Sequence, residues 1–191
     1  MNLFEILFNA LGVTKPPPPV LTPPAPSVPR IYEPPWLSVA RKQVGFVEKP
    51  GNQGIEKYCG LAKCGHAGDP WCAIFVNAML ETVGLPGTMS AMARSFENSK
   101  YFKRLKAPAM GCIVTIWRGS KSSGSGHVFF YLGENDNGFV ALGGNQKNQV
   151  CVQYEPKNRL TGYWWPTSLP DPALGAIYCP TLSGVTDGSE E

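Results

Sequence analysis

Hydrophobic positions along the chain predict helices in its first half and strands in its second. Apolar residues at positions 72, 75, 76, 79, 80 and 83 share one helical face, which predicts a buried helix over residues 72–83. Asp69 and Pro70 are expected to supply its N-cap and first turn, and Gly84 its end. Shorter helices are expected over residues 36–44, 54–62 and 90–98.

Beyond residue 110, short apolar runs alternate with Gly and Asn, a pattern typical of β-strands joined by tight turns. The expected strands are Cys112–Trp117, His127–Leu132, Phe139–Leu142, Val150–Tyr154 and Gly162–Trp165. Helices followed by consecutive strands predict an α+β fold, in which the helices pack on an antiparallel sheet.

Composition changes sharply near residue 35. Ten of the 19 prolines lie between positions 16 and 35, and such a segment forms an extended spacer because it lacks amide donors. We therefore expect a linker over residues 14–35, a domain over residues 36–166 and an irregular tail over residues 167–191. Leucines spaced by four indicate a short amphipathic anchor helix in residues 1–13. A frayed terminus or a degenerate export signal is the alternative there.

Composition also excludes several classes of protein. The 191 residues carry a net charge of +3 without a long block of Lys or Arg, which argues against binding of nucleic acid. No apolar run approaches the ~20 residues of a membrane span. Aromatic residues make up 11% of the chain, which argues against global disorder. The six cysteines do not fix the redox compartment of a chain of this length.

Cys72 is the first candidate for chemistry because it opens the most clearly predicted helix. The unpaired N–H groups and the positive dipole at a helix start stabilise a thiolate, which is the nucleophilic form of cysteine. A structural cysteine would fit the same position, since cysteines are often buried.

A nucleophilic cysteine needs a base, and the chain contains two histidines, His66 and His127. His66 lies in a Gly-rich loop where nothing fixes its direction. His127 opens a predicted strand, a rigid position for a general base, with a surface histidine at a strand edge as the alternative. Asn145 follows the next strand after two glycines, so its amide oxygen could orient the imidazole. Gly-Gly-Asn is also an ordinary turn composition.

Three motifs together resemble a known family of hydrolases. They are Pro70-Trp71-Cys72-Ala73-Ile74-Phe75-Val76-Asn77, Gly126-His127-Val128 and Leu142-Gly143-Gly144-Asn145-Gln146. In this order and spacing they are similar to the CHAP and NlpC-type cysteine peptidases of bacteria and phages, over roughly residues 36–166. The resemblance implies a papain-like fold, in which the cysteine opens a helix packed on a small antiparallel sheet that carries the histidine.

The resemblance also implies roles for individual residues. Cys72 matches the nucleophile, His127 the base and Asn145 the third polar residue, while the backbone amide of Cys72 matches the oxyanion-hole donor. Weaker candidates for oxyanion or substrate binding are Tyr58, Trp71, Gly126 and Phe129.

Two positions depart from the family pattern. Phe129 stands where relatives tend to carry a small residue, and by strand alternation it shares a face with His127, so it would narrow the cleft. Gly111-Cys112 replaces the Gly-Asp that usually opens the first strand. Both changes leave the three catalytic candidates in place but alter the expected substrate preference.

The activity that the resemblance implies is cleavage of an amide bond in the stem peptide or cross-bridge of bacterial peptidoglycan. The enzyme would be an endopeptidase or an N-acetylmuramoyl-L-alanine amidase, of the endolysin or virion-associated type, acting in the periplasm or outside the cell. Residues 1–13 would dock to a virion, a secretion assembly or a membrane surface. The alternatives are a secreted cysteine-dependent toxin or deamidase acting on protein, and an inactive wall-binding module.

No metal or organic cofactor is expected for this chemistry. A zinc site is the competing interpretation of the cysteines near the candidate nucleophile, but their spacing is loose and no second His–Cys pair follows. The residues concerned are Cys59, Cys64, His66 and Cys72.

Overall fold

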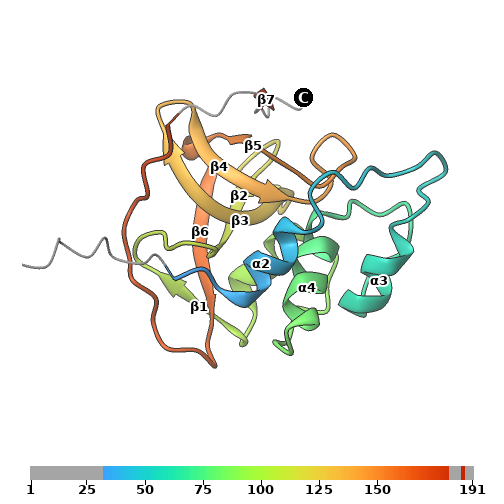
Figure 1. Ribbon diagram of the computed structural model, residues 1–191, viewed down its shortest axis with the longest axis horizontal. Helices are drawn as coiled ribbons and strands as arrows, with labels where there is room; N and C mark the ends of the chain where they lie inside the picture. Colours follow the sequence, from blue (N-terminus) through green and yellow to red (C-terminus); the bar gives the residue numbers. More distant parts are fainter. Residues whose placement is uncertain (1–31, 181–185, 188–191) are drawn as a thin grey trace, which may run out of the picture. The chain divides into compact units, whose positions relative to one another are not determined.

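The computed structural model describes residues 32–180 and 186–187, which contain one β-sheet packed against helices (Figure 1). Six strands pair antiparallel in the order β1-β6-β2-β3-β4-β5, and the short β7 joins β5 in parallel. The predicted α+β class is therefore confirmed. The strands are β1 (Phe102–Leu105), β2 (Ile113–Trp117), β3 (Gly126–Asn135), β4 (Gly138–Gly143), β5 (Cys151–Glu155), β6 (Leu160–Pro166) and β7 (Thr186–Asp187).

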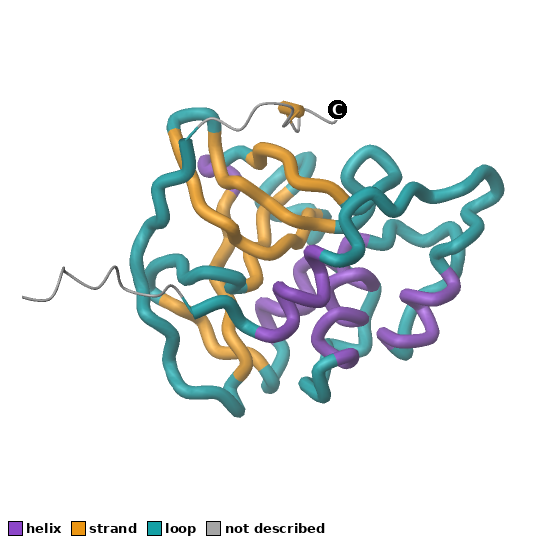
Figure 2. The backbone as a smooth tube through the Cα atoms, in the orientation of Figure 1, coloured by secondary structure: helices purple, strands orange, loops and turns teal. Residues whose placement is uncertain are grey.

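The α-helices of the described chain gather to one side of the sheet (Figure 2). They are α2 (Pro35–Arg41), α3 (Glu56–Ala62) and α4 (Cys72–Thr82). Two short 3-10 helices, η1 (Ala93–Asn98) and η2 (Lys157–Arg159), lie in the connections before β1 and before β6. The central one is α4, which contacts α2, α3, β3 and β4. The predicted α-helices over 36–44, 54–62 and 72–83 are thus confirmed within a few residues, whereas 90–98 contains a 3-10 helix.

Helix α4 is enclosed on every side. All residues from 72 to 80 are buried, Asn77 included. The helix is therefore buried on more faces than the one apolar face that the sequence predicts. The predicted cap is wrong: Trp71 occupies the N-cap position without a side-chain hydrogen bond, and Asp69 accepts a hydrogen bond from the backbone N–H of His66. The first turn of α4 therefore carries no capping side chain at the point where Cys72 lies.

The sheet is more than the consecutive meander that the sequence predicts. Strands β2 to β5 do follow one another, but β6 returns to pair with β2 on one side and with β1 on the other. The sequence did not predict β1, because two of its four residues are charged and the strand is short. Its pairing with β6, far away in the chain, supplies the stability that its composition lacks.

The beginning of β3 extends past the end of β4. Strand β3 pairs with β2 from Gly126 onward, but its pairing with β4 starts only where Phe130 lies opposite Leu142. In the described chain, residues 126–129 therefore lack a strand partner on that edge. This open edge is the part of the sheet that receives the start of α4.

Residues 167–180, expected to be an irregular tail, run as an extended strap along the end of β3. The backbone N–H of Glu134 donates to the carbonyl of Ile177 at 2.8 Å, and the N–H of Cys179 donates to the carbonyl of Glu134 at 3.0 Å. The Asn135 side chain also donates to the Cys179 carbonyl at 3.0 Å. Contacts of the folded domain therefore continue past residue 166 to the end of the strap.

Two predictions concern segments at the chain ends. The anchor over residues 1–13 and nearly all of the linker over 14–35 lie outside the described residues, as do residues 181–185 and 188–191 of the tail. Within the part of the chain that the structure describes, no helix has the length and apolar character needed to cross a membrane.

Candidate functional site

Cys72 is the first residue of α4, and its thiol lies against the open edge of β3. The backbone N–H of Val128 hydrogen-bonds its sulfur, together with the N–H groups of Cys72 and Ala73 in the first helical turn. The sulfur therefore lies beside the residue that follows His127. Only 4% of Cys72 is exposed.

His127, the second residue of β3, is completely buried. Its Nε2 lies 3.2 Å from Oε1 of Gln146. Gln146 uses its own Nε2 to donate to the carbonyl of Cys151 at 2.7 Å, which fixes the amide orientation and leaves Oε1 as an acceptor. The imidazole consequently carries its proton on Nε2, and Nδ1 keeps a free lone pair. Among the described residues, Nδ1 of His127 has no hydrogen-bond partner.

The partner that orients His127 is thus Gln146, in place of the predicted Asn145. Asn145 is only partly buried and adopts a left-handed φ of 56°, typical of a turn. The backbone groups of Gln146 and Gln149 bond to each other across this turn, and Gln146 is fully buried. The turn therefore directs the side chain after Asn145 towards His127. The quoted motif Gly-Gly-Asn-Gln contained this signal, but spacing alone did not identify which amide points inward.

The two glycines before this turn make room for the site. A Cβ on Gly144 would meet the Phe75 Cβ at 2.5 Å and the Trp71 ring at 2.6 Å. A Cβ on Gly143 would overlap the Gln146 carboxamide. Close approach of the turn to the start of α4 therefore requires glycine at both positions.

Burial keeps both candidate catalytic groups neutral at rest. Burial raises the pKa of the Cys72 thiol, while the positive charge of Arg118 and the backbone N–H groups oppose that shift. Burial and the Arg118 charge lower the pKa of His127 from 6.5 to about 3, while the hydrogen bond with Gln146 raises it. The site therefore holds a neutral thiol and a neutral imidazole, and the described residues show no hydrogen bond from the thiol to Nδ1 of His127. Arg118, which follows β2, was not identified from the sequence, where it is one of 17 basic residues.

A second polar pair lies on the same side of His127 as Gln146, facing Nε2. Glu155, the last residue of β5, is 2% exposed, and its Oε1 lies 3.5 Å from Nε2 of His127. Gln153, also buried, donates its Nε2 to the same Oε1 at 2.7 Å. Neither residue could be identified from the sequence, because Gln153 lies 26 and Glu155 28 positions after the histidine on a separate strand.

Three of the weaker candidates form the aromatic surroundings of the site. Trp71 and Tyr58 stack with centroids 5.9 Å apart, and Trp71 donates its Nε1 to Glu48 at 2.8 Å. The hydroxyl of Tyr58 donates to the side-chain oxygen of Gln43 at 3.1 Å, and burial raises its pKa. The hydroxyl proton of Tyr58 is therefore engaged with Gln43 in this conformation. Phe129 is fully buried with its ring centroid 5.8 Å from that of His127, on the expected face.

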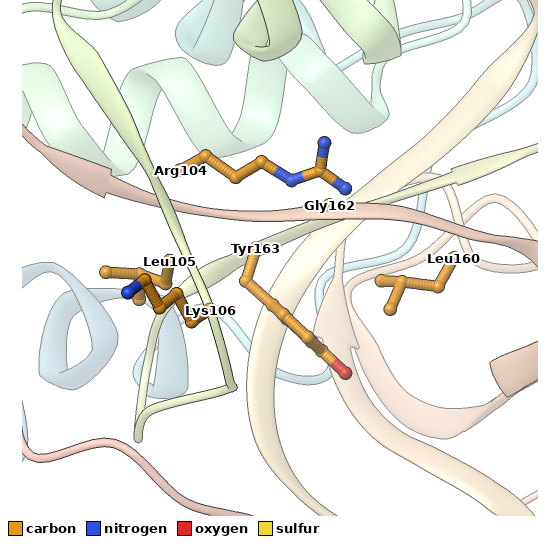
Figure 3. Close-up of a pocket in the computed structure, with 6 residues that line it drawn as sticks. All are labelled: Arg104, Leu105, Lys106, Leu160, Gly162 and Tyr163. Carbon is orange, nitrogen blue, oxygen red and sulfur yellow. The ribbon is translucent and has the colours of Figure 1, made fainter.

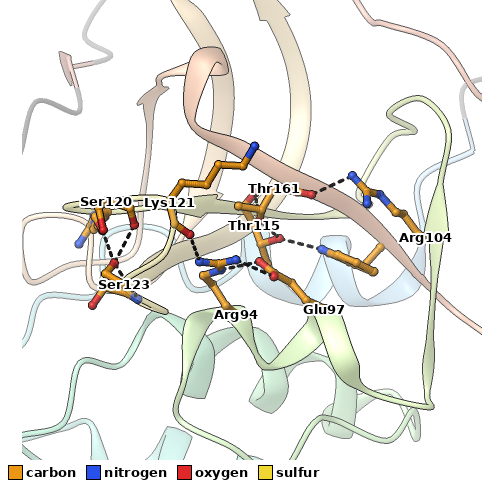
Figure 4. Close-up of polar contacts among 11 residues, drawn as sticks. Arg94, Glu97, Arg104, Thr115, Ser120, Lys121, Ser123 and Thr161 are labelled. Atoms are coloured by element: carbon orange, nitrogen blue, oxygen red, sulfur yellow. Dashed lines mark hydrogen bonds and ion pairs between the residues drawn. The ribbon is translucent and has the colours of Figure 1, made fainter.

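The loop before His127 is tied down by Arg94 of η1 (Figure 4). Arg94 forms two hydrogen bonds with the Glu97 carboxylate, at 2.7 and 2.9 Å, and donates to the Lys121 carbonyl at 2.9 Å. A Cβ on Gly126 would meet the Arg94 side chain at 2.8 Å. Gly126 thus allows the loop and η1 to approach each other immediately before the histidine.

Two pockets in the described chain lie apart from these residues. One of about 390 Å³ lies where β1 and β6 meet, and is lined by Arg104, Leu105, Lys106, Leu160, Gly162 and Tyr163 (Figure 3). Another, of about 420 Å³, separates η1 from the loop that precedes His127. Neither is lined by Cys72 or His127. These two residues are 4% and 0% exposed, so the candidate site is closed in this conformation.

None of the six cysteines is in a disulfide. His66 is 94% exposed at its side chain and faces Asp69 at 3.7 Å. Among the described residues, no group of three His, Cys, Asp or Glu side chains is placed to hold a metal ion.

No protein-family model and no curated protein matches this chain.

Proposed function

We propose that this protein is a cysteine hydrolase that cleaves an amide bond in the peptide part of bacterial peptidoglycan. The observation that carries the proposal is the position of the Cys72 sulfur at the start of α4, against the backbone N–H of Val128, the residue after His127. Gln146 in turn accepts the Nε2 proton of that histidine. A thiol, a base and an orienting amide are the parts that thiol-dependent acyl transfer requires. The motif resemblance directs the proposal towards peptidoglycan within a papain-like fold.

The neutral resting state determines how the reaction would begin. His127 Nδ1 has no partner among the described residues, so the reaction begins with a movement that brings the Cys72 thiol within its reach. Nδ1 then removes the thiol proton as the sulfur attacks the substrate carbonyl carbon, because neither group is charged beforehand. The N–H groups of Cys72 and Ala73 stabilise the oxyanion that forms. His127 then donates the proton to the leaving amine as the C–N bond breaks. Water, deprotonated by the same nitrogen, then attacks the thioester carbonyl. The C–S bond breaks, the carboxylic acid product leaves, and the Cys72 thiolate takes the proton back from His127.

Access to the site requires a movement. Cys72 and His127 are buried, so a peptide reaches the sulfur only when a covering segment is displaced. The loop over residues 119–125 is the best candidate, because it leads directly into His127 and is fastened chiefly by Arg94 and by its own serines. This opening step would restrict cleavage to substrates that bind well enough to drive it.

The decisive experiment compares muropeptides released from purified sacculi by wild type, Cys72→Ala and His127→Ala. We expect both variants to lose activity by at least about 10²-fold, since each removes a member of the acyl-transfer pair. Mass spectrometry of the released fragments identifies the bond that is cut. Cys59→Ala is the matched control, because Cys59 is a partly buried thiol on α3 with no role in this mechanism.

The outcome also separates the alternatives. A wild-type protein that releases no fragment but deamidates a protein side chain in a Cys72-dependent manner would indicate the toxin or deamidase function. Binding to sacculi without any cleavage would indicate an inactive wall-binding module. Equal release by wild type and Cys72→Ala would refute the cysteine mechanism.

A further inference from the structure

A buried carboxylate beside the candidate base is unexplained by the Cys–His–amide arrangement. Glu155 is 2% exposed, and its side chain reaches His127 from β5, the strand whose Cys151 carbonyl also holds the Gln146 amide. Its Oε1 lies 3.5 Å from His127 Nε2 and accepts a hydrogen bond from Gln153 at 2.7 Å. Burying a carboxylate is costly, so its position next to the imidazole calls for an explanation.

The electrostatics of His127 supply that explanation. During acyl transfer the imidazole becomes positively charged when it takes the thiol proton. His127 has no contact with solvent, and the positive charge of Arg118 further disfavours its protonation. Gln146 orients the ring but is a neutral amide, so it offsets little of this cost. A negative charge at the Nε2 side of the ring favours the imidazolium directly.

We infer that Glu155 is a positioning residue that acts through His127, holding the imidazole from β5 and stabilising its protonated form. The catalytic role of Glu155 rests on the proposed function. Its position rests on its contacts with His127 and Gln153. His127 Nε2–H then faces two oxygens, Gln146 Oε1 at 3.2 Å and Glu155 Oε1 at 3.5 Å. Gln153 aims the carboxylate by bonding the oxygen that faces the histidine.

The charges around His127 come from several elements. Cys72 approaches from α4, Arg118 from the end of β2, and Glu155 from β5. Phe129 on β3 and Gln146 after β4 contribute no charge. A change at Glu155 therefore alters the carboxyl group that faces His127 Nε2 at 3.5 Å, and its effect should appear in the pH dependence of Cys72 reactivity.

The test measures alkylation of Cys72 by iodoacetamide between pH 5 and 10, with peptide-resolved mass spectrometry to separate its signal from the other thiols. Glu155→Gln keeps the size and the acceptor oxygen but removes the charge. We expect alkylation at pH 7 to fall about tenfold, the effect of a pKa shift of about one unit. Glu155→Asp keeps the charge and should react at a rate between those of wild type and Glu155→Gln.

Glu134→Gln is the matched control. Glu134 is a carboxylate on β3 that bonds Tyr131 and Lys157 and does not contact His127, so its neutralisation should leave Cys72 alkylation within twofold of wild type. The inference is overturned if folded Glu155→Gln reacts like wild type, or if Glu155→Asp is no faster than Glu155→Gln. Should Glu155→Gln not fold, Gln153→Leu replaces it: a threefold fall supports the inference and an unchanged rate overturns it.

Two further readouts separate this inference from the proposed function. His127→Gln should slow Cys72 alkylation whatever the substrate is, and an unchanged rate would refute the Cys–His pair itself. If His127→Gln slows the reaction but Glu155→Gln does not, only the role of Glu155 fails. With sacculi as substrate, Glu155→Gln should lower kcat about tenfold and leave KM unchanged, because Glu155 has no substrate contact in this arrangement.

Discussion

Single side chains set the direction of the chemistry at the candidate site. Gln146 cannot turn its amide over without losing its 2.7 Å bond to the Cys151 carbonyl, so its oxygen stays towards His127. That constraint selects one tautomer of the imidazole and leaves Nδ1 as its basic atom. Gly143 and Gly144 permit this arrangement because any larger residue would occupy the space of Gln146, Trp71 or Phe75.

The residue-level prediction concerns which amide orients the histidine. Gln146→Leu removes the acceptor for His127 Nε2, so the ring loses its fixed tautomer, and peptidoglycan cleavage should fall about a hundredfold. Asn145→Ala is the adjacent control and should keep activity within a few-fold of wild type. Steady-state cleavage of sacculi measures both. The reverse pattern, with Asn145→Ala inactive and Gln146→Leu active, would contradict the assignment.

At the scale of elements, the site forms because the beginning of β3 extends past the end of β4. Strand β3 continues beyond β4, and the uncovered edge receives the start of α4. The helix start thus completes the hydrogen bonding of the strand, and its thiol occupies the place of a neighbouring strand. This junction also buries His127, which makes the folded protein sensitive to acid.

The prediction at this scale is a pH dependence of stability. The pKa of His127 is about 3 in the folded protein, below its ordinary value of 6.5. Between these values the unfolded chain binds a proton that the folded chain does not, so stability is lost as the pH falls below 6.5. For each pH unit in this range, wild type should lose about 1.4 kcal/mol more than His127→Gln.

Urea unfolding at pH 7, 6 and 5 measures this difference. Comparison with His127→Gln cancels the contribution of the carboxylates that lie away from His127, and the same comparison in a Glu155→Gln background removes that of Glu155, which faces the ring. Parallel curves for the two proteins would mean that His127 is protonated in the folded state, contrary to the burial argument.

For the whole molecule, the folded part begins earlier and ends later than the predicted domain over 36–166. A Cβ on Gly111 would meet the Pro34 ring at 2.5 Å, and the Leu37 N–H bonds the Pro34 carbonyl. The strap over residues 167–180 adds backbone bonds to β3 at the opposite end. A deletion that tests the N-terminal segment should therefore stop before residue 32, so that Pro34 is kept.

Deletion of residues 1–31 tests the proposed anchor. We expect the thermal midpoint of unfolding and the cleavage of isolated sacculi to remain as in the full chain, since the chain from Ile31 onward forms a compact unit of its own. Association with membranes or particles should be lost, because the apolar segment over residues 1–13 is removed. Co-sedimentation with vesicles and with purified particles measures this loss. Association equal to that of the full chain would refute the anchor.

The sequence by itself determined the helix that carries Cys72, the strand that begins with His127 and the turn after β4, because each depends on local spacing and local turn chemistry. It also indicated an α+β arrangement. It could not distinguish Asn145 from Gln146, since only packing against α4 decides which side chain of the turn points inward. Arg118, Gln153 and Glu155 were equally hidden, because the pairing of strands, and not their separation in the chain, brings these residues to His127. Burial, which sets the pKa values of the thiol and the imidazole, likewise arises only when the sheet and α4 meet.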